Sequence, residues 1–330
     1  MSAENAVAST GKIYYSQIDA LKGIAIFLVV LGHGIILYPI DLHQNDVCEF
    51  VFRWLSSVHM PLFFMISGFC FSYRGSYGQF IWKKVKRLLI PYFVFNILDL
   101  IPRYLFPSLV NRPRGIAESV HKIIFDGGEL WFLYTLFIIF LVYPFIYRLI
   151  KRSVYLFAGT LVLLLIVHFV WTSVPVFRLG EVIYYLFYFT IGVMVKEYLG
   201  KNIFDVKLGR LKTVAATGTL LMLWLILLEL NSSHLGIIAA LIGIFTLYIS
   251  LQYGVLVQIF SRFGPYSLQI YLLNGFLLVI SRTTIVSILQ ITNPFAITVF
   301  NMLVDFFLSY IIIKYICAKL PPVRILMGMT

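Results

Sequence analysis

Apolar residues run in blocks of about twenty along the whole chain, and short clusters of charged residues, Pro and Gly separate the blocks. An α-helix of about 20 residues crosses the hydrocarbon core of a bilayer, which is roughly 30 Å thick. The pattern therefore predicts an all-α, polytopic integral membrane protein with about ten transmembrane helices. We place these helices at residues 18–38, 50–73, 87–107, 130–150, 154–174, 181–198, 212–230, 234–252, 265–281 and 295–318.

Composition agrees with this pattern. The 330 residues are 61% hydrophobic and 12% charged, against about 25% charged in typical soluble domains. A water-soluble globule is excluded, and no loop is long enough for a separate soluble domain. We expect a single membrane domain over residues 1–330, with residues 1–17 as a short cytoplasmic N-terminal segment. No small-residue cleavage site follows the first apolar block, which indicates a retained helix rather than a removed signal peptide.

The basic residues indicate how the chain is oriented. An even number of helices puts both termini on one side, and placing that side in the cytoplasm assigns 19 of the 26 Lys and Arg residues to it. Short cytoplasmic loops carry an excess of Lys and Arg, so both termini are predicted to be cytoplasmic. The net charge of +12 then reports topology, and nucleic-acid binding is not needed to explain it.

The same features limit location and chemistry. A multi-pass protein with a positive inner side is expected in the cell membrane, the inner or plasma membrane, in contact with lipid. Cys48, Cys70 and Cys317 lie far apart and form no CxxC pair, so neither a disulfide framework nor a metal site is predicted. Chemistry must then be carried by the helices and their short loops.

The first apolar block contains Lys22 at its inner end and His33 in its outer half. Eleven helical residues give three turns plus about 20°, so both side chains lie on one stripe about 16 Å apart along the axis. Ionisable residues inside a span are costly and usually face a cavity or one another. The alternatives are that Lys22 only anchors the helix at the interface and that His33 makes one hydrogen bond to a neighbouring helix.

Two further groups extend this pattern. His59 lies in the second block at a depth similar to that of His33, because the two helices run in opposite directions; a packing histidine is the alternative. Lys84 and Arg87 lead into the third block and are spaced to face the same way. Clustered Lys and Arg side chains suit phosphates, although any inner loop is expected to be basic.

At these residues the sequence resembles the membrane-bound acyltransferase 3 family, whose members O-acylate glycans of the cell surface and envelope. The matching elements are IDALKGIAIFLVVLGH at 18–33, HMPLFFMISGF at 59–69, KKVKRLLIPY at 83–92 and LWFLYTLF at 130–137, with weaker matches at 184–192 and 263–274. The family's Arg-x10-His pair stands here as Lys22 and His33, and its Arg-x-x-Arg motif as Lys84 and Arg87. Asn274 stands where many relatives have histidine.

The resemblance implies an O-acyltransferase that uses a cytosolic acyl-CoA, most simply acetyl-CoA, as co-substrate, with no permanently bound cofactor. The acceptor would be a hydroxyl of a glycan or lipid-linked sugar. Lys84, Arg87 and Lys22 would hold the CoA head, and the acyl arm would follow the helix stripe towards His33. His33 would act as general base on the hydroxyl, because histidine titrates near neutrality, with His59 and Lys22 assisting. A covalent acyl-histidine route stays open.

Other polar residues are candidates with weaker patterns. Glu129 and Trp131 stand at the outer end of the fourth block, where a carboxylate and an indole could bind a sugar. The alternative is that Glu129 only ends an acidic loop and that Trp131 belongs to the aromatic belt at the membrane interface. Asn274 is a third candidate for substrate binding. Asp305 lies in the middle of the last block, and we expect it to have a buried partner, with Arg282 as one candidate.

A protein of another class fits much of this pattern. Ten helices with a few buried ionisable groups also suit a transporter or a glycan-lipid flippase without acyl transfer. Such proteins are commonly built from repeated halves with broken helices, and no convincing repeat is present. A structural role is a third option, but it gives the Lys22 and His33 stripe no purpose.

Overall fold

The computed structural model describes residues 15–105, 115–170, 176–205, 207–230 and 235–329. Every regular element in these ranges is a helix. Most of the predicted N-terminal segment 1–17 and the end of the predicted span 154–174 lie outside the described residues.

The predicted all-α membrane fold is confirmed. Nine helical segments among the described residues are long and apolar enough to cross a membrane, and α7 is a shorter apolar helix beside them. The main helices of the nine segments are α1 (Ser16–Gly34), α2 (Asp46–Phe69), α4 (Ile90–Leu105), α6 (Trp131–Ile150), α8 (Leu179–Tyr198), α9 (Arg210–Glu229), α10 (Gly236–Ser250), α12 (Ser267–Arg282) and the pair α13 (Pro294–Leu303) and α14 (Ser309–Tyr315), and the shorter helix α7 is Val154–Val170.

Shorter helices join these spans, and the sequence pattern did not resolve them. They are η2 (Leu42–Gln44), α3 (Tyr77–Lys84), α5 (Ile116–Phe125), η5 (Gly128–Leu130), η6 (Val176–Arg178), η7 (Gly200–Phe204), η9 (Leu251–Tyr253), α11 (Val255–Phe260), η10 (Gly264–Tyr266), η13 (Cys317–Lys319) and α15 (Pro321–Leu326). Three π-helical turns also occur: η3 (Val85–Leu89), η11 (Thr283–Ile288) and η12 (Val304–Leu308). π-Turns are frequent at functional sites.

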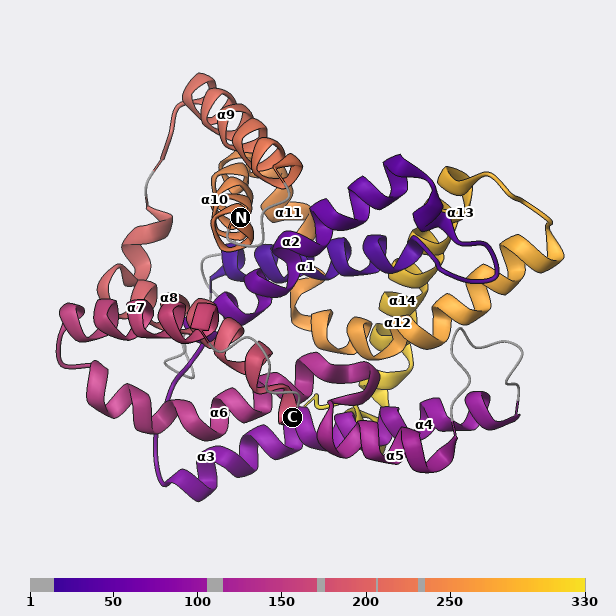
Figure 1. The fold of residues 1–330 in the computed structure, drawn as a ribbon, viewed down its shortest axis with the longest axis horizontal. Coiled ribbons are helices and arrows are strands. Elements are labelled where there is room, and N and C mark those ends of the chain that lie inside the picture. The colour runs from indigo at the N-terminus through magenta and orange to yellow at the C-terminus, as the bar shows by residue number, and fades with distance from the viewer. Residues whose placement is uncertain (1–14, 106–114, 171–175, 206, 231–234, 330) are drawn as a thin grey trace.

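Helix α1 runs through the middle of the bundle, between α2 and the C-terminal helices (Figure 1). Glycines allow this central position because they bring backbones close together. A Cβ added at Gly23 would lie 2.1 Å from the carbonyl oxygen of Phe260, and one at Gly264 would lie 2.0 Å from that of Asp19. The helix ends at Gly34, four residues before the predicted end at 38, because the chain becomes extended at Ile35.

Helices α2 and α8 cross equally closely. A Cβ at Gly68 would lie 2.0 Å from the carbonyl oxygen of Phe189, and one at Gly192 would lie 1.9 Å from that of Met65. The two glycines therefore let each backbone pack directly on the other. This crossing fixes α2, which carries His59, against the scaffold.

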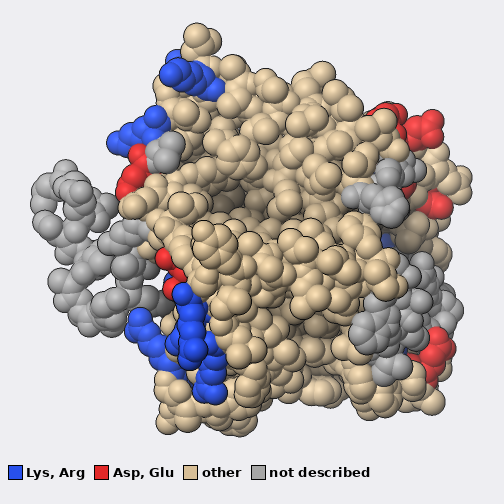
Figure 2. Space-filling view, turned by 60° about the vertical axis from the view of Figure 1, so that its left-hand side comes forward, with Lys and Arg blue, Asp and Glu red and all other residues tan. Residues whose placement is uncertain are grey.

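Charge is distributed as a membrane protein requires. On the face that Figure 2 shows, Lys and Arg side chains gather towards one edge and Asp and Glu mainly towards the opposite edge, with a broad uncharged band between them. The band matches the layer of apolar helices, since charged side chains are costly in hydrocarbon. Which edge faces the cytoplasm stays a prediction from the positive charges.

Candidate active site

A cavity of about 650 Å³ opens at the end of the bundle where α1 begins. Volumes of roughly 300–1,000 Å³ are usual for small-molecule sites. Each surrounding helix contributes a stripe of side chains at helical spacing, as α2 does with Met60, Phe63, Ser67 and Cys70. The full lining is Tyr15, Ile18, Asp19, Lys22, Met60, Phe63, Ile66, Ser67, Cys70, Lys84, Arg87, Leu88, Phe132, Leu136, Phe140, Gly264, Pro265, Ser267, Leu268 and Tyr271.

Three basic residues that the sequence singled out separately meet in this cavity. Lys22, Lys84 and Arg87 all line it, together with one carboxylate, that of Asp19. The Nζ of Lys22 donates a hydrogen bond of 3.0 Å to Oδ1 of Asp19, which fixes the lysine at the cavity wall. The mouth therefore carries a net positive charge and suits an anionic ligand.

Lys84 and Arg87 are held differently. The Lys84 ammonium lies 3.8 Å from the centre of the Phe140 ring and 5.2 Å from that of Phe80, so aromatic faces orient it. Arg87 is exposed, and no ion pair involves its guanidinium among the residues that the structure describes. Its fork-shaped set of donors is thus available for a phosphate.

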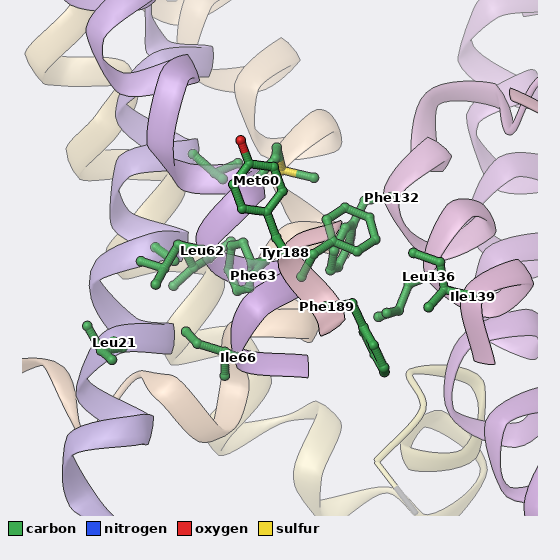
Figure 3. Packing of buried hydrophobic residues seen from close by; sticks show 14 of the residues in the cluster. Leu21, Met60, Leu62, Phe63, Ile66, Phe132, Leu136, Ile139, Tyr188 and Phe189 are labelled. Carbon is green, nitrogen blue, oxygen red and sulfur yellow. The ribbon is translucent and has the colours of Figure 1, made fainter. Parts of the chain in front are cut away.

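The deep end of the cavity is closed by aromatic rings. The Phe132 ring lies 5.6 Å from that of Phe63 and 5.7 Å from that of Tyr271, measured between ring centroids. Met60 borders the same end, and Figure 3 shows it with Phe63 and Phe132 in the packed interior. The sequence pattern does not indicate these residues, because aromatic residues in an apolar helix occur equally where the helix faces a cavity, a core or lipid.

The predicted histidines lie beyond this closed end. Neither His33 nor His59 lines the cavity, although Met60 beside His59 does. Helix α1 is continuous from Lys22 to His33, so the predicted stripe exists. Between them on that stripe, Ile26 and Val29 are fully buried. An apolar section therefore separates the basic cavity from the histidines.

The two histidines form a cluster with Glu129. The His33 and His59 rings are close enough to interact electrostatically, and so are His33 and Glu129. The His33 side chain is exposed in the structure. Glu129 also interacts electrostatically with Tyr271 of the cavity wall.

The hydrogen bond of His59 determines which of its nitrogens can act as a base. Nδ1 lies 2.7 Å from the carbonyl oxygen of Leu55. A carbonyl only accepts, so Nδ1 carries the hydrogen and Nε2 keeps its lone pair. The hydrogen bond to Leu55 of the same helix therefore orients the His59 ring. It also fixes the tautomer in which Nε2 can accept a proton.

The other predicted site residues lie in defined but different settings. Glu129 pairs with Arg103 at 3.3 Å. The Trp131 ring lies between the guanidinium of Arg178, 5.2 Å from the ring centroid, and the Tyr185 ring at 5.5 Å. Asn274 is buried on α12 and does not line the cavity. Among the described residues, no group of three His, Cys, Asp or Glu could hold a metal ion.

Fold and cavity together define a multi-pass membrane protein with a basic cavity at one end of the bundle and two histidines beyond it. A family model described as "Acyltransferase domain" matches residues 15–314. The chain belongs to this family, acyltransferase 3.

Curated relatives match over a shorter region. The nodulation protein NolL of Sinorhizobium fredii (strain NBRC 101917 / NGR234) is 30% identical over 127 residues, which cover 37% of this chain and 34% of that protein. NolL of Mesorhizobium japonicum (strain LMG 29417 / CECT 9101 / MAFF 303099) is 30% identical over 133 residues, or 37% of this chain and 33% of that protein. The chain thus spans about a third of the length of these relatives. No solved structure matches it.

Proposed function

We propose that this acyltransferase transfers an acetyl group from cytosolic acetyl-CoA to a hydroxyl of a cell-surface glycan or lipid-linked sugar, in the cell membrane. The observation that carries the proposal is the meeting of Lys22, Lys84 and Arg87 in one cavity, with His33 and His59 beyond its closed end. CoA has a polyanionic head and a long, thin arm. A basic mouth and a narrow apolar interior suit these two parts.

The head and arm of the donor would use different parts of the cavity. Arg87 and Lys84 would bind phosphates by charge-assisted hydrogen bonds, with Lys22 as a third cation. The arm would then run between α1 and α2 towards Phe63, Phe132 and Tyr271. Because these rings close the deep end, transfer requires them to move so that the thioester reaches His33 and His59.

The chemistry follows from the groups beyond that end. Attack of an alcohol on a thioester needs removal of the hydroxyl proton and stabilisation of an oxyanion. In this proposal His33 takes the proton and later gives it to the CoA thiolate as that leaves. His59, with its Nε2 lone pair, holds the hydroxyl or the His33 ring in position. Glu129, Trp131 and Asn274 are the proposed acceptor-binding residues.

Transfer of label is the test of this proposal. Membranes that contain the protein should move labelled acetyl groups from acetyl-CoA into the glycan fraction, and membranes without it should not. A transporter or flippase would move a substrate while leaving acetyl-CoA intact. Intact acetyl-CoA together with substrate flux would therefore contradict the proposal.

Cys70 provides a built-in probe of the donor site. It is exposed and lines the cavity, whereas Cys48 and Cys317 are buried. We expect N-ethylmaleimide to modify Cys70 first, and saturating acetyl-CoA to slow that modification at least about tenfold by filling the cavity. S-Acetylpantetheine, which lacks the phosphates and has no free thiol to consume the reagent, should protect much less at the same concentration. Measurement is by mass spectrometry of the modified peptides.

The Cys70→Ser variant is the control for this labelling, because it should lose the fast modification and keep the fold. An unchanged rate of Cys70 modification at saturating acetyl-CoA would mean that the donor does not bind in this cavity.

A further inference from the structure

The last residues of the chain fold back onto the turn that carries Arg87. Helix α15 ends at Leu326 and packs beside α4, where Figure 1 marks the end of the chain. Met327 and Gly328, which follow it, are buried. The match to the family model ends at residue 314, so residues 321–329 lie outside the matched region. We call residues 321–329 the C-terminal hook.

The backbone at Arg87 lacks part of the usual support of a helix. Arg87 lies in the π-helical turn Val85–Leu89, directly before α4. In an α-helix its carbonyl oxygen would accept a hydrogen bond from the residue four positions later. That residue is Pro91, which has no N–H to donate. Regular helix geometry therefore does not by itself fix the backbone that carries the Arg87 side chain.

Gly328 of the C-terminal hook packs against this same carbonyl group. A Cβ added at Gly328 would lie 2.4 Å from the carbonyl oxygen of Arg87 and 3.3 Å from Cγ of Pro91. Gly328 also has a φ of +66°, in the left-handed region that favours glycine. Glycine alone meets both requirements, the close approach and the backbone conformation.

A buried glutamine holds the C-terminal hook in place. Gln269 on α12 is 4% exposed, and its Nε2 donates a hydrogen bond of 3.0 Å to the carbonyl oxygen of Met327. Leu268 and Tyr271, close to Gln269 on the same helix, line the basic cavity. The hook is therefore attached to a helix that forms one wall of the cavity, and it contacts the turn that carries Arg87.

The three cations of the cavity differ in what holds them. Asp19 binds Lys22, and aromatic rings orient Lys84. No ion pair involves Arg87 within the part of the chain that the structure describes. The position of the Arg87 guanidinium therefore depends on the backbone beneath it.

We propose that the C-terminal hook is a positioning element for Arg87. Gly328 packs on the Arg87 carbonyl group, Gln269 holds the hook, and together they keep the guanidinium at the mouth of the cavity. This inference rests on the proposed function, in which Arg87 binds the phosphates of the donor.

Two glycine variants with similar backbones test this role. Gly328→Ala should displace the hook and raise the KM for acetyl-CoA about five- to tenfold with kcat nearly unchanged, because a displaced Arg87 weakens binding in the ground state and the transition state alike. Gly254 has a φ of +57°, and a Cβ there would meet no atom within 4 Å. Gly254→Ala imposes a similar backbone strain without the contact and should leave KM unchanged.

Combination with Arg87→Ala separates positioning from a general structural effect. If the hook acts through Arg87, Gly328→Ala should raise KM no further in a protein that already carries Arg87→Ala, because coupled residues are not additive. Gln269→Met removes the donor to Met327 and keeps the bulk of the side chain, so it should also raise KM, and it replaces Gly328→Ala in the test if that variant does not fold. Full additivity with Arg87→Ala, or a KM equal to that of Gly254→Ala, would overturn the proposal.

Hydrogen exchange distinguishes a failure of this inference from a failure of the proposed function. Without any donor present, Gly328→Ala should speed exchange of the backbone amides in residues 85–90 relative to Gly254→Ala, measured by mass spectrometry of the full chain in detergent. If the parent protein shows no saturable dependence on acetyl-CoA, the proposed function fails, and the exchange rates alone decide whether the hook holds this turn. Equal exchange in the two variants would overturn the inference, whatever the result of the acetyl-transfer test.

Discussion

Replacing His33 with alanine is expected to reduce acetyl transfer at least about 100-fold, because positioned general bases contribute roughly 10²–10⁴ to rates. The His33 side chain is exposed, so truncation should leave the surrounding packing and the amount of protein unchanged. The measurement is initial-rate transfer from labelled acetyl-CoA, normalised to protein in the membrane. Donor binding, followed as protection of Cys70, should stay as in the parent protein.

The histidine comparison is sharpened by two further variants. His59→Ala should also lower the rate, but less, if His59 orients groups and His33 takes the proton. His121→Ala changes an exposed histidine on α5 and serves as the control. Full activity in His33→Ala would remove His33 from the reaction, and a larger loss in His59→Ala than in His33→Ala would make His59 the base.

Replacing Arg87 with alanine is expected to weaken acetyl-CoA binding by about tenfold to a hundredfold, since a hydrogen bond to a charged group contributes about 1.5–3 kcal/mol. The effect should appear in KM, with kcat nearly unchanged, because the phosphates bind equally in the ground state and the transition state. Lys84→Ala should act in the same direction, and it also removes the ammonium from the Phe140 ring.

Lys83 provides a matched control for these two residues. It is exposed, adjoins Lys84 and does not line the cavity. Lys83→Ala should leave KM unchanged. Equal increases in KM for Lys83→Ala and Arg87→Ala would show that general surface charge, and not the cavity, attracts the donor.

The membrane fold could be predicted from the sequence because hydrocarbon imposes one requirement on every span, an apolar helix of sufficient length. The connecting helices could not. Tyr77–Lys84 is short and carries lysines, and its Ser76 capping box is a local signal that a hydropathy scale does not register. The end of α1 at Gly34 could not be predicted either, because apolar residues continue to Tyr38 while the backbone becomes extended at Ile35.

The site was predictable only where charge marks it. Lys22, Lys84 and Arg87 stand out in an apolar chain, and the structure brings all three to one cavity. Phe132 and Tyr271 do not stand out in the sequence, because aromatic residues also occur at exposed positions of other helices in the chain. The partner of Asp305 was also beyond the sequence, because the pairing with Ser281 is set by how α12 packs on η12.

The central claim is that one route through the protein connects the basic cavity with the histidines, and sealed vesicles test it most directly. Labelled acetyl-CoA is supplied only on the face that carries Lys84 and Arg87, and label is sought in glycan confined to the opposite face. We expect labelled glycan on the opposite face of the membrane. Arg87→Ala should lose this labelling at low acetyl-CoA concentration, and His33→Ala should lose it at any acetyl-CoA concentration. Label that appears only when donor and acceptor share one face would contradict it.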